Sequence, residues 1–188
     1  MLLRRLATVA ALAAGGYWLK KKMSSKLRRS TGELSFVQDS IEVEVPIRTA
    51  YNQWTQFEEF PRFMEGVQSV RQLDDAQLIW RAEIGGKAVE WQAKITEQVP
   101  DQRIAWRSVS GARNAGVVRF ERLGDQHCRV TLDLEYEPEG MVENVGDFLG
   151  VVQRRATGDL KRFKTFIEHR SHETGAWRGS IPHSGSAR

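Results

Sequence analysis

Apolar and polar residues alternate along one segment after another between residues 40 and 138. The pattern then changes to apolar residues spaced three or four apart between residues 141 and about 169. Alternation at every second residue is typical of a strand with one buried face, and the wider spacing is typical of an amphipathic helix. A sheet and a single long helix bury both apolar faces when the sheet wraps round the helix. The sequence therefore predicts an α+β fold whose interior forms a cavity.

About seven strands are expected. The alternation is clearest at residues 41–45, 67–73, 78–84, 89–95, 104–108, 117–123 and 128–136. Short connections that contain Gly, Pro or Asp separate these segments, and Gly85-Gly86 is typical of a tight hairpin. Because such connections are too short to cross over a sheet, the strands are expected to run antiparallel.

Three helices are expected besides the strands. After the first strand, Thr49 is the expected N-cap of a short helix, and residues 60–64 begin a second one. The long helix at residues 141–169 could extend about 40 Å at roughly 1.5 Å per residue, which is enough to cross a whole sheet. Its apolar stripe faces the sheet and comprises Val145, Phe148, Val152, Ala156, Leu160, Phe163 and Ile167.

Several short motifs occur in the order that these elements predict. They are the segments at residues 45–47, 60–64, 66–70, 104–108, 114–120, 130–132 and 136–140, together with Trp54. With them the chain resembles the polyketide cyclase/dehydrase and START-like (SRPBCC) superfamily, nearest the coenzyme Q-binding START-like branch. The resemblance covers about residues 40–170 and implies a helix-grip fold. The superfamily includes lipid carriers, quinone binders, cyclases and stress proteins, so the fold alone does not fix the function.

The net charge of +4 is unevenly divided along the chain. Eight of the 28 basic residues lie in residues 1–30, which contain no acidic residue, so the remainder has 20 basic residues against 24 acidic ones. An acidic domain does not suit nucleic acid, and we expect no such partner. The single cysteine, Cys128, excludes an intrachain disulfide, and its place on an apolar strand face predicts a buried thiol rather than a nucleophile.

Residues 1–30 form a basic and apolar head. Its uncharged stretch, residues 6–19, is shorter than the roughly 20 residues that span a bilayer comfortably. Arg4 and Arg5 before a short apolar run are typical of a signal peptide, whereas the aromatic and lysine residues at 17–22 are typical of an interfacial anchor. We favour membrane association without cleavage. The alternatives are a signal peptide, with a secreted or periplasmic protein, and a flexible basic leader with no membrane role.

The composition divides the rest of the chain into three parts. Residues 31–39 form a polar linker, residues 40–170 form the START-like domain, and residues 171–188 form a tail rich in Gly and Ser that we expect to be disordered. Trp177 in this tail could dock on the domain or on a partner, although a solvated tail is the simpler expectation.

The sequence contains no clear catalytic motif. It has no phosphate-binding glycine loop, no nucleophile-elbow serine and no metal-type His/Cys cluster, and we expect no metal or cofactor. The four histidines, His127, His169, His172 and His183, lie at a hairpin end or in and near the tail. Acid pairs such as Glu42 with Glu44, and Asp133 with Glu135, fall on polar strand faces and are expected to be solvated.

The candidate ligand-binding residues follow from the inward faces. They are Trp54, Phe63, Met64, Trp80, Trp91, Trp106, Phe120, Tyr136, Phe148, Val152 and Arg155. Arg155 lies one position from the apolar stripe and could bind the polar head of a lipid, or it could be a surface ion-pair partner. Arg107, Arg113 and Asn114 are expected near the rim.

Three functions fit these observations. The favoured one is non-covalent binding of a hydrophobic ligand, a lipid or isoprenoid quinone, in the cavity of a membrane-tethered domain. The second is a polyketide cyclase or dehydratase, which requires an ionisable side chain inside the pocket. The third is an interaction module with a filled core. The volume and lining of the space between sheet and helix separate these alternatives.

Overall fold

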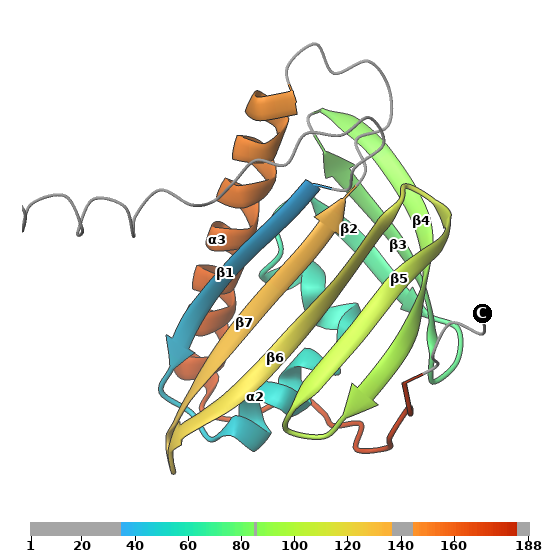
Figure 1. The fold of residues 1–188 in the computed structure, drawn as a ribbon. Helices are drawn as coiled ribbons and strands as arrows, with labels where there is room; N and C mark the ends of the chain where they lie inside the picture. Colours follow the sequence, from blue (N-terminus) through green and yellow to red (C-terminus); the bar gives the residue numbers. More distant parts are fainter. Residues whose placement is uncertain (1–34, 85, 137–144, 184–188) are drawn as a thin grey trace, which may run out of the picture. The chain divides into compact units, whose positions relative to one another are not determined.

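One antiparallel sheet curves around one long helix in the computed structural model, which describes residues 35–84, 86–136 and 145–183 (Figure 1). The elements follow in the order β1 (Ser35–Val43), α2 (Ile47–Trp54), the 3₁₀ helix η1 (Phe57–Arg62), β2 (Val67–Gln72), β3 (Gln77–Ile84), β4 (Lys87–Val99), β5 (Arg103–Gly111), β6 (Asn114–Gly124), β7 (His127–Tyr136) and α3 (Val145–Arg170). The predicted α+β helix-grip architecture is confirmed.

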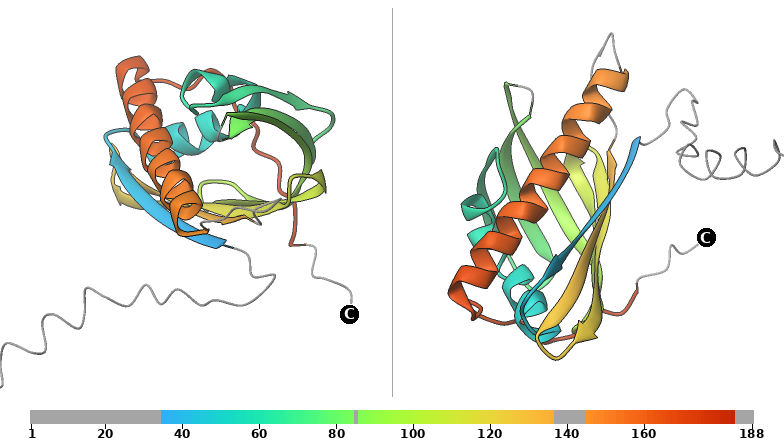
Figure 2. Two further views of the ribbon diagram at one scale, coloured as in Figure 1. Left: turned by 90° about the horizontal axis from the view of Figure 1, so that it is seen from above. Right: turned by 90° about the vertical axis from the view of Figure 1, so that its left-hand side faces the viewer.

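The sheet has seven strands in the order β1-β7-β6-β5-β4-β3-β2. Consecutive strands from β2 to β7 pair as antiparallel neighbours, and β1 joins the far edge by pairing with β7. Figure 2 shows that the sheet curls and that α3 lies across its concave face. Strand β1 begins earlier than the alternation suggested because Val37 already points inward and is buried.

The first short helix begins before the residue expected to cap it. Pro46 occupies the N-cap with φ −55°, and its carbonyl accepts the hydrogen bond from the Ala50 N–H at 3.1 Å. Thr49 therefore lies inside α2 and caps nothing. The fixed φ of proline is compatible with the start of a helix, and no side chain caps this end of α2.

Aromatic rings fill the end of the domain around α2. Trp54 packs edge-on against Phe60, Phe120 and Phe163, and Phe63 packs against Phe163 at 5.3 Å between centroids. All five side chains are buried. Edge-to-face pairs of this kind add to the burial of large apolar areas. This part of the interior is therefore solid.

The segment that follows α3 differs from the expected disordered tail. Residues 171–183 are placed along α2 and reach β4, where Ile181 and Gln98 exchange two backbone hydrogen bonds of 2.8 and 3.0 Å. The Trp177 side chain is half-buried, and its indole N–H donates to Asp75 at 3.2 Å. Composition alone suggested disorder, but specific partners on the domain outweigh it.

Among the helices that the structure describes, none combines the length and the hydropathy that a membrane span requires. The expected head at residues 1–30 lies outside the described residues.

Candidate functional site

A cavity of about 170 Å³ lies between the sheet and the N-terminal half of α3. Its lining is almost wholly apolar and comes from Trp54 at the end of α2, from η1, from β2 to β7 and from α3. The residues around it are Trp54, Phe57, Phe60, Met64, Glu65, Val67, Leu78, Trp80, Ala82, Trp91, Ile95, Ile104, Trp106, Asn114, Leu132, Leu134, Glu135, Tyr136, Val151, Val152, Arg155, Ala156 and Asp159. The interior is therefore solid at the α2 end and hollow at the other.

Three tryptophans on neighbouring strands form the aromatic wall of the cavity. Trp80 of β3 and Trp91 of β4 are directly opposite each other in the sheet, and their rings stack at 5.5 Å with an interplanar angle of 10°. Trp106 of β5 lines the same cavity. The period-two pattern of a strand puts these rings on one face, and the register brings the first two into contact.

A glycine on β6 makes room for the third tryptophan. Gly116 is the direct cross-strand partner of Trp106. A Cβ at this position would overlap Trp106 Cζ2 and would lie 2.7 Å from the backbone oxygen of Asp133. The indole of Trp106 therefore lies over bare backbone, as an aromatic ring can when its partner lacks a side chain.

Charged groups gather where α3 meets the loop before β2. Arg155 donates from Nη1 to the backbone oxygen of Glu83 at 2.6 Å. Asp159 lies one turn further along α3 and accepts a 2.8 Å hydrogen bond from the Glu65 N–H and another from Arg162. Arg155, Asp159 and Glu65 all line the cavity and give it polar groups beside α3. Asn114, Glu135 and Tyr136 line it from β6 and β7.

Burial raises the pKa of the Asp159 carboxyl above its ordinary value. The hydrogen bonds from Glu65 and Arg162, and the charges of Arg162 and Arg155, favour the carboxylate and oppose this shift. Desolvation is the largest effect, and it penalises the charged form. A carboxyl beside an apolar cavity with a raised pKa is a group that can hold or release a proton.

Most of the residues expected around a ligand do line this cavity. They are Trp54, Met64, Trp80, Trp91, Trp106, Tyr136, Val152 and Arg155. Phe63 and Phe120 point inward as expected, but they are buried in the aromatic packing around Trp54 and do not reach the cavity. Phe148 belongs to α3, but its side chain lies outside the described residues.

The sequence interpretation missed the acidic side of the cavity. Asp159 and Glu65 were not among the candidates, although both line the cavity beside Arg155. A signal was present, because Arg155 and Asp159 are four residues apart and so share one helix face. Asn114, expected at the rim, also lines the cavity, and its side-chain amide donates to the Ala112 carbonyl at 3.0 Å.

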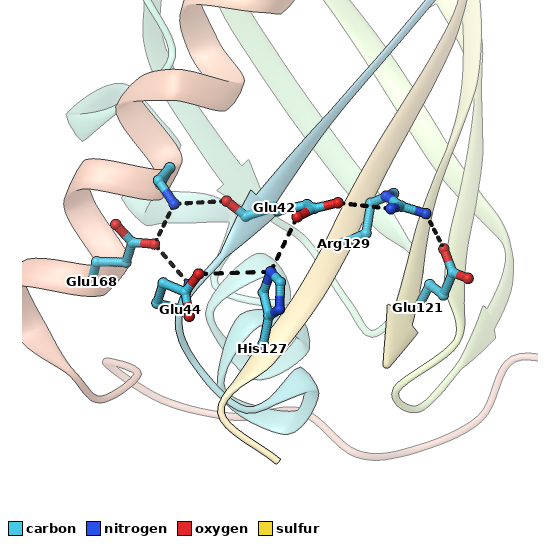
Figure 3. Close-up of polar contacts among 7 residues, drawn as sticks. Glu42, Glu44, Glu121, His127, Arg129 and Glu168 are labelled. Carbon is cyan, nitrogen blue, oxygen red and sulfur yellow. Dashed lines mark hydrogen bonds and ion pairs between the residues drawn. The ribbon is translucent and has the colours of Figure 1, made fainter. Parts of the chain in front are cut away.

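Glu42 of β1 and Glu121 of β6 form ion pairs with basic residues of β7 on the outer face of the sheet (Figure 3). Arg129 lies between Glu42, at 2.7 Å, and Glu121, at 2.8 Å. His127 Nε2 is 3.2 Å from Glu42 Oε2. None of these residues lines the cavity, so this network belongs to the solvated face.

Metal binding and thiol chemistry each depend on particular side chains. No group of three or more His, Cys, Asp or Glu residues within it is arranged to hold a metal ion. Cys128 is fully buried, and burial raises the pKa of its thiol to about 11. A thiol that holds its proton so firmly is inert at neutral pH.

Comparison with known proteins agrees with the fold. The model of the family "Polyketide cyclase / dehydrase and lipid transport" matches residues 43–165. An uncharacterized 17.2 kDa protein of Streptomyces lincolnensis is 52% identical over 149 residues, which are 79% of this chain and 99% of that protein.

Two solved structures share the architecture at low sequence identity. The Zhui aromatase/cyclase of a Streptomyces species has a TM-score of 0.63 at 14% identity, covering 77% of this chain and 99% of that one. A START superfamily protein of Mycobacterium smegmatis has a TM-score of 0.59 at 18% identity, covering 72% and 96%. These likenesses establish the fold, and the family match spans most of the folded domain. The chain belongs to the polyketide cyclase/dehydrase and lipid transport family.

Proposed function

We propose that the domain binds a hydrophobic ligand of the lipid or isoprenoid quinone class in the cavity between the sheet and α3. The observation that supports this most directly is an apolar space of about 170 Å³ that the protein's own rings leave unfilled. Such space is costly to maintain in a core, because packing it would add stability. A filled interaction module has no use for it.

The size of the cavity limits what it takes in. Ligand pockets commonly measure roughly 300–1,000 Å³, and an engineered apolar cavity of about 150 Å³ admits benzene. A volume of about 170 Å³ therefore suits a ring system or a short branched segment of a ligand rather than a whole lipid chain. The stacked Trp80 and Trp91 offer a planar ring an apolar surface, and Arg155 is near enough to the lining to bind a carbonyl or acidic head group.

Native mass spectrometry of protein purified without detergent tests this proposal, together with titration by the neutral fluorescent probe N-phenyl-1-naphthylamine. Val152→Trp places a large ring in the cavity and should abolish probe binding and any co-purifying lipid. Thr165→Trp adds the same ring at an exposed position of the same helix and is the matched control. Binding that survives Val152→Trp, or a wild-type protein that repeatedly carries no lipid and binds no probe, contradicts the proposal.

The second candidate is a cyclase or dehydratase, and the ionisable groups around the cavity favour it. Tyr136, Arg155 and Asp159 all line the cavity, and the pKa of the Asp159 carboxyl is raised. A carboxylic acid and a guanidinium beside an apolar space could transfer a proton and stabilise an enolate. Incubation with a linear poly-β-ketone thioester should then yield a dehydrated ring product that Asp159→Asn does not form. Unchanged thioester would leave ligand binding as the better function.

The resemblance to the coenzyme Q-binding branch and the membrane attachment through residues 1–30 belong to the same proposal. Their support is the sequence pattern of the head and of the motifs given above. Fractionation of cells that express the full chain, beside a variant without residues 1–30, tests the attachment. A full chain found only in the soluble fraction would exclude the anchor.

A further inference from the structure

The segment after α3 runs along the end of the domain at α2 and continues towards β4 (Figures 1 and 2). We call residues 173–181 the C-terminal strap. Asn52 and Gln53 of α2 are almost fully buried, and their amides bond to the strap. Gln53 donates to Thr174 Oγ1 at 3.2 Å and accepts from the Thr174 N–H at 2.9 Å, whereas Asn52 donates to Glu173 at 2.7 Å.

Arg178 connects this strap to two parts of the domain. Its guanidinium donates to both carboxylate oxygens of Asp101, at 3.0 and 2.7 Å, and to Asn52 Oδ1 at 2.8 Å. Its Cζ also lies 5.6 Å from the centre of the Tyr51 ring. Bidentate pairing fixes both the position and the orientation of a guanidinium. Arg178 therefore joins the turn between β4 and β5 to helix α2.

The strap ends on a free stretch of sheet edge. The pairing of β4 with its neighbour β3 stops at Lys94 of β4. Beyond that point Gln98 of β4 pairs with Ile181 of the strap. The side-chain amide of Gln98 donates to the Tyr51 hydroxyl at 3.0 Å. The strap thus satisfies backbone groups that an uncovered edge would leave unpaired within the protein.

Helix α2 connects the strap to the cavity. Trp54 lies between Gln53 and Thr55 in the chain. The Thr55 hydroxyl accepts a 3.1 Å hydrogen bond from the backbone N–H of Trp177. The Trp54 ring is packed on Phe163 and lines the cavity. The residues on both sides of Trp54 are therefore held from outside by the strap while its ring forms part of the cavity wall.

We propose that the C-terminal strap holds α2 in position, and with it the Trp54 side chain that forms part of the cavity wall. Arg178 is the positioning residue, because it ties the strap to α2 and to Asp101. The proposal rests on the cavity being the ligand site, as proposed above. It assigns a role in ligand binding to residues beyond 165, where the family match ends.

The test compares Arg178→Gln and Asp101→Asn, which break the same ion pair from opposite sides, with Arg81→Gln. Arg81 and Glu90 form an exposed ion pair between β3 and β4 that does not involve the strap, so this variant controls for loss of charge. Hydrogen exchange should accelerate in α2 in the first two variants alone. Their dissociation constant for N-phenyl-1-naphthylamine should rise by about fivefold or more, and Arg178→Lys should restore part of the affinity.

The readouts separate a positioning role from a stabilising one. If the strap only adds stability, Arg178→Gln lowers the unfolding temperature but leaves the dissociation constant of the folded protein unchanged, and the proposal is wrong. Unchanged exchange in α2 also overturns it. A wild-type protein that binds no probe refutes the ligand site, whereas faster α2 exchange in both ion-pair variants would still show that the strap holds the helix.

Discussion

Trp80 and Trp91 stack face to face across β3 and β4, with ring centroids 5.5 Å apart, and both rings lie on the cavity wall. The pair is a product of register, because a shift of one residue in either strand would turn one indole to the outer face. Both residues are only partly buried, so part of the apolar surface of this wall is left uncovered by the rest of the protein.

Trp91→Ala should weaken ligand binding more than it weakens the fold. Removing the ring takes away half of the stacked pair and enlarges the cavity, and because the residue is only partly buried we expect a loss of about 2 kcal/mol in the free energy of unfolding. Urea unfolding and titration with N-phenyl-1-naphthylamine measure the two effects. Trp91→Phe keeps an aromatic surface and is the matched control. Equal affinity in Trp91→Ala would mean that the wall does not contact the ligand.

Asp159 should make the stability depend on pH in an uncommon direction for an acid. Its folded-state pKa is raised above 3.8 by burial, so the folded protein binds the proton more tightly than the unfolded chain. The contribution of Asp159 to the free energy of unfolding is therefore fully present below pH 3.8. It is lost as the pH rises through the folded-state pKa of this carboxyl. Asp159→Asn should remove this loss.

Urea unfolding of both proteins between pH 3 and pH 7 checks this prediction. The free energy of unfolding of the wild type, measured relative to that of Asp159→Asn, should fall as the pH rises and then become constant. A difference that shifts the other way would mean that the hydrogen bonds from Glu65 and Arg162 outweigh desolvation. Carbon-13 NMR of the carboxyl would assign the titration to this residue.

The fold was predictable because each strand carries its own evidence. Period-two alternation requires only neighbouring residues, and the helix stripe ending in Phe163 and Ile167 identified the face that is now buried. Short connections then indicated that the strands run antiparallel, although they did not predict that β1 pairs with β7. The start of the first helix was predicted wrongly, because Thr49 has the chemistry of a cap but Pro46 occupies the N-cap.

The site was predictable only in part, because alternation says which side chains point inward and not which of them meet. Phe63 and Phe120 share the inward orientation of Trp80, yet α2 brings Trp54 against them and closes that end. The strap could not be predicted from composition. Its order depends on partners such as Asp101, which is distant from Arg178 in the sequence.

Cys128 should react slowly with thiol reagents until the protein unfolds. Burial raises the pKa of its thiol from 9.0 to about 11, so the reactive thiolate is scarce at pH 8. The same shift stabilises the folded state below pH 9, and this contribution is lost as the pH rises towards 11. Labelling with 5,5′-dithiobis(2-nitrobenzoic acid) at pH 8, with and without urea, measures this. Rapid labelling of the native protein would contradict the burial of this strand face.

Gly116→Ala should displace the Trp106 ring from its place in the cavity wall. The new methyl group would overlap the indole of Trp106 and would lie 2.7 Å from the backbone oxygen of Asp133, which the β6–β7 pairing holds in place. The backbone oxygen cannot move away, so the ring must turn or the strands must separate, at a cost of about 1–3 kcal/mol in unfolding free energy.

Gly124→Ala is the control, because its Cβ would meet nothing closer than the His127 Cβ at 3.7 Å. We expect thermal unfolding and probe binding to change together in Gly116→Ala alone. Wild-type affinity in a destabilised Gly116→Ala protein would show that the position of Trp106 does not matter for the ligand.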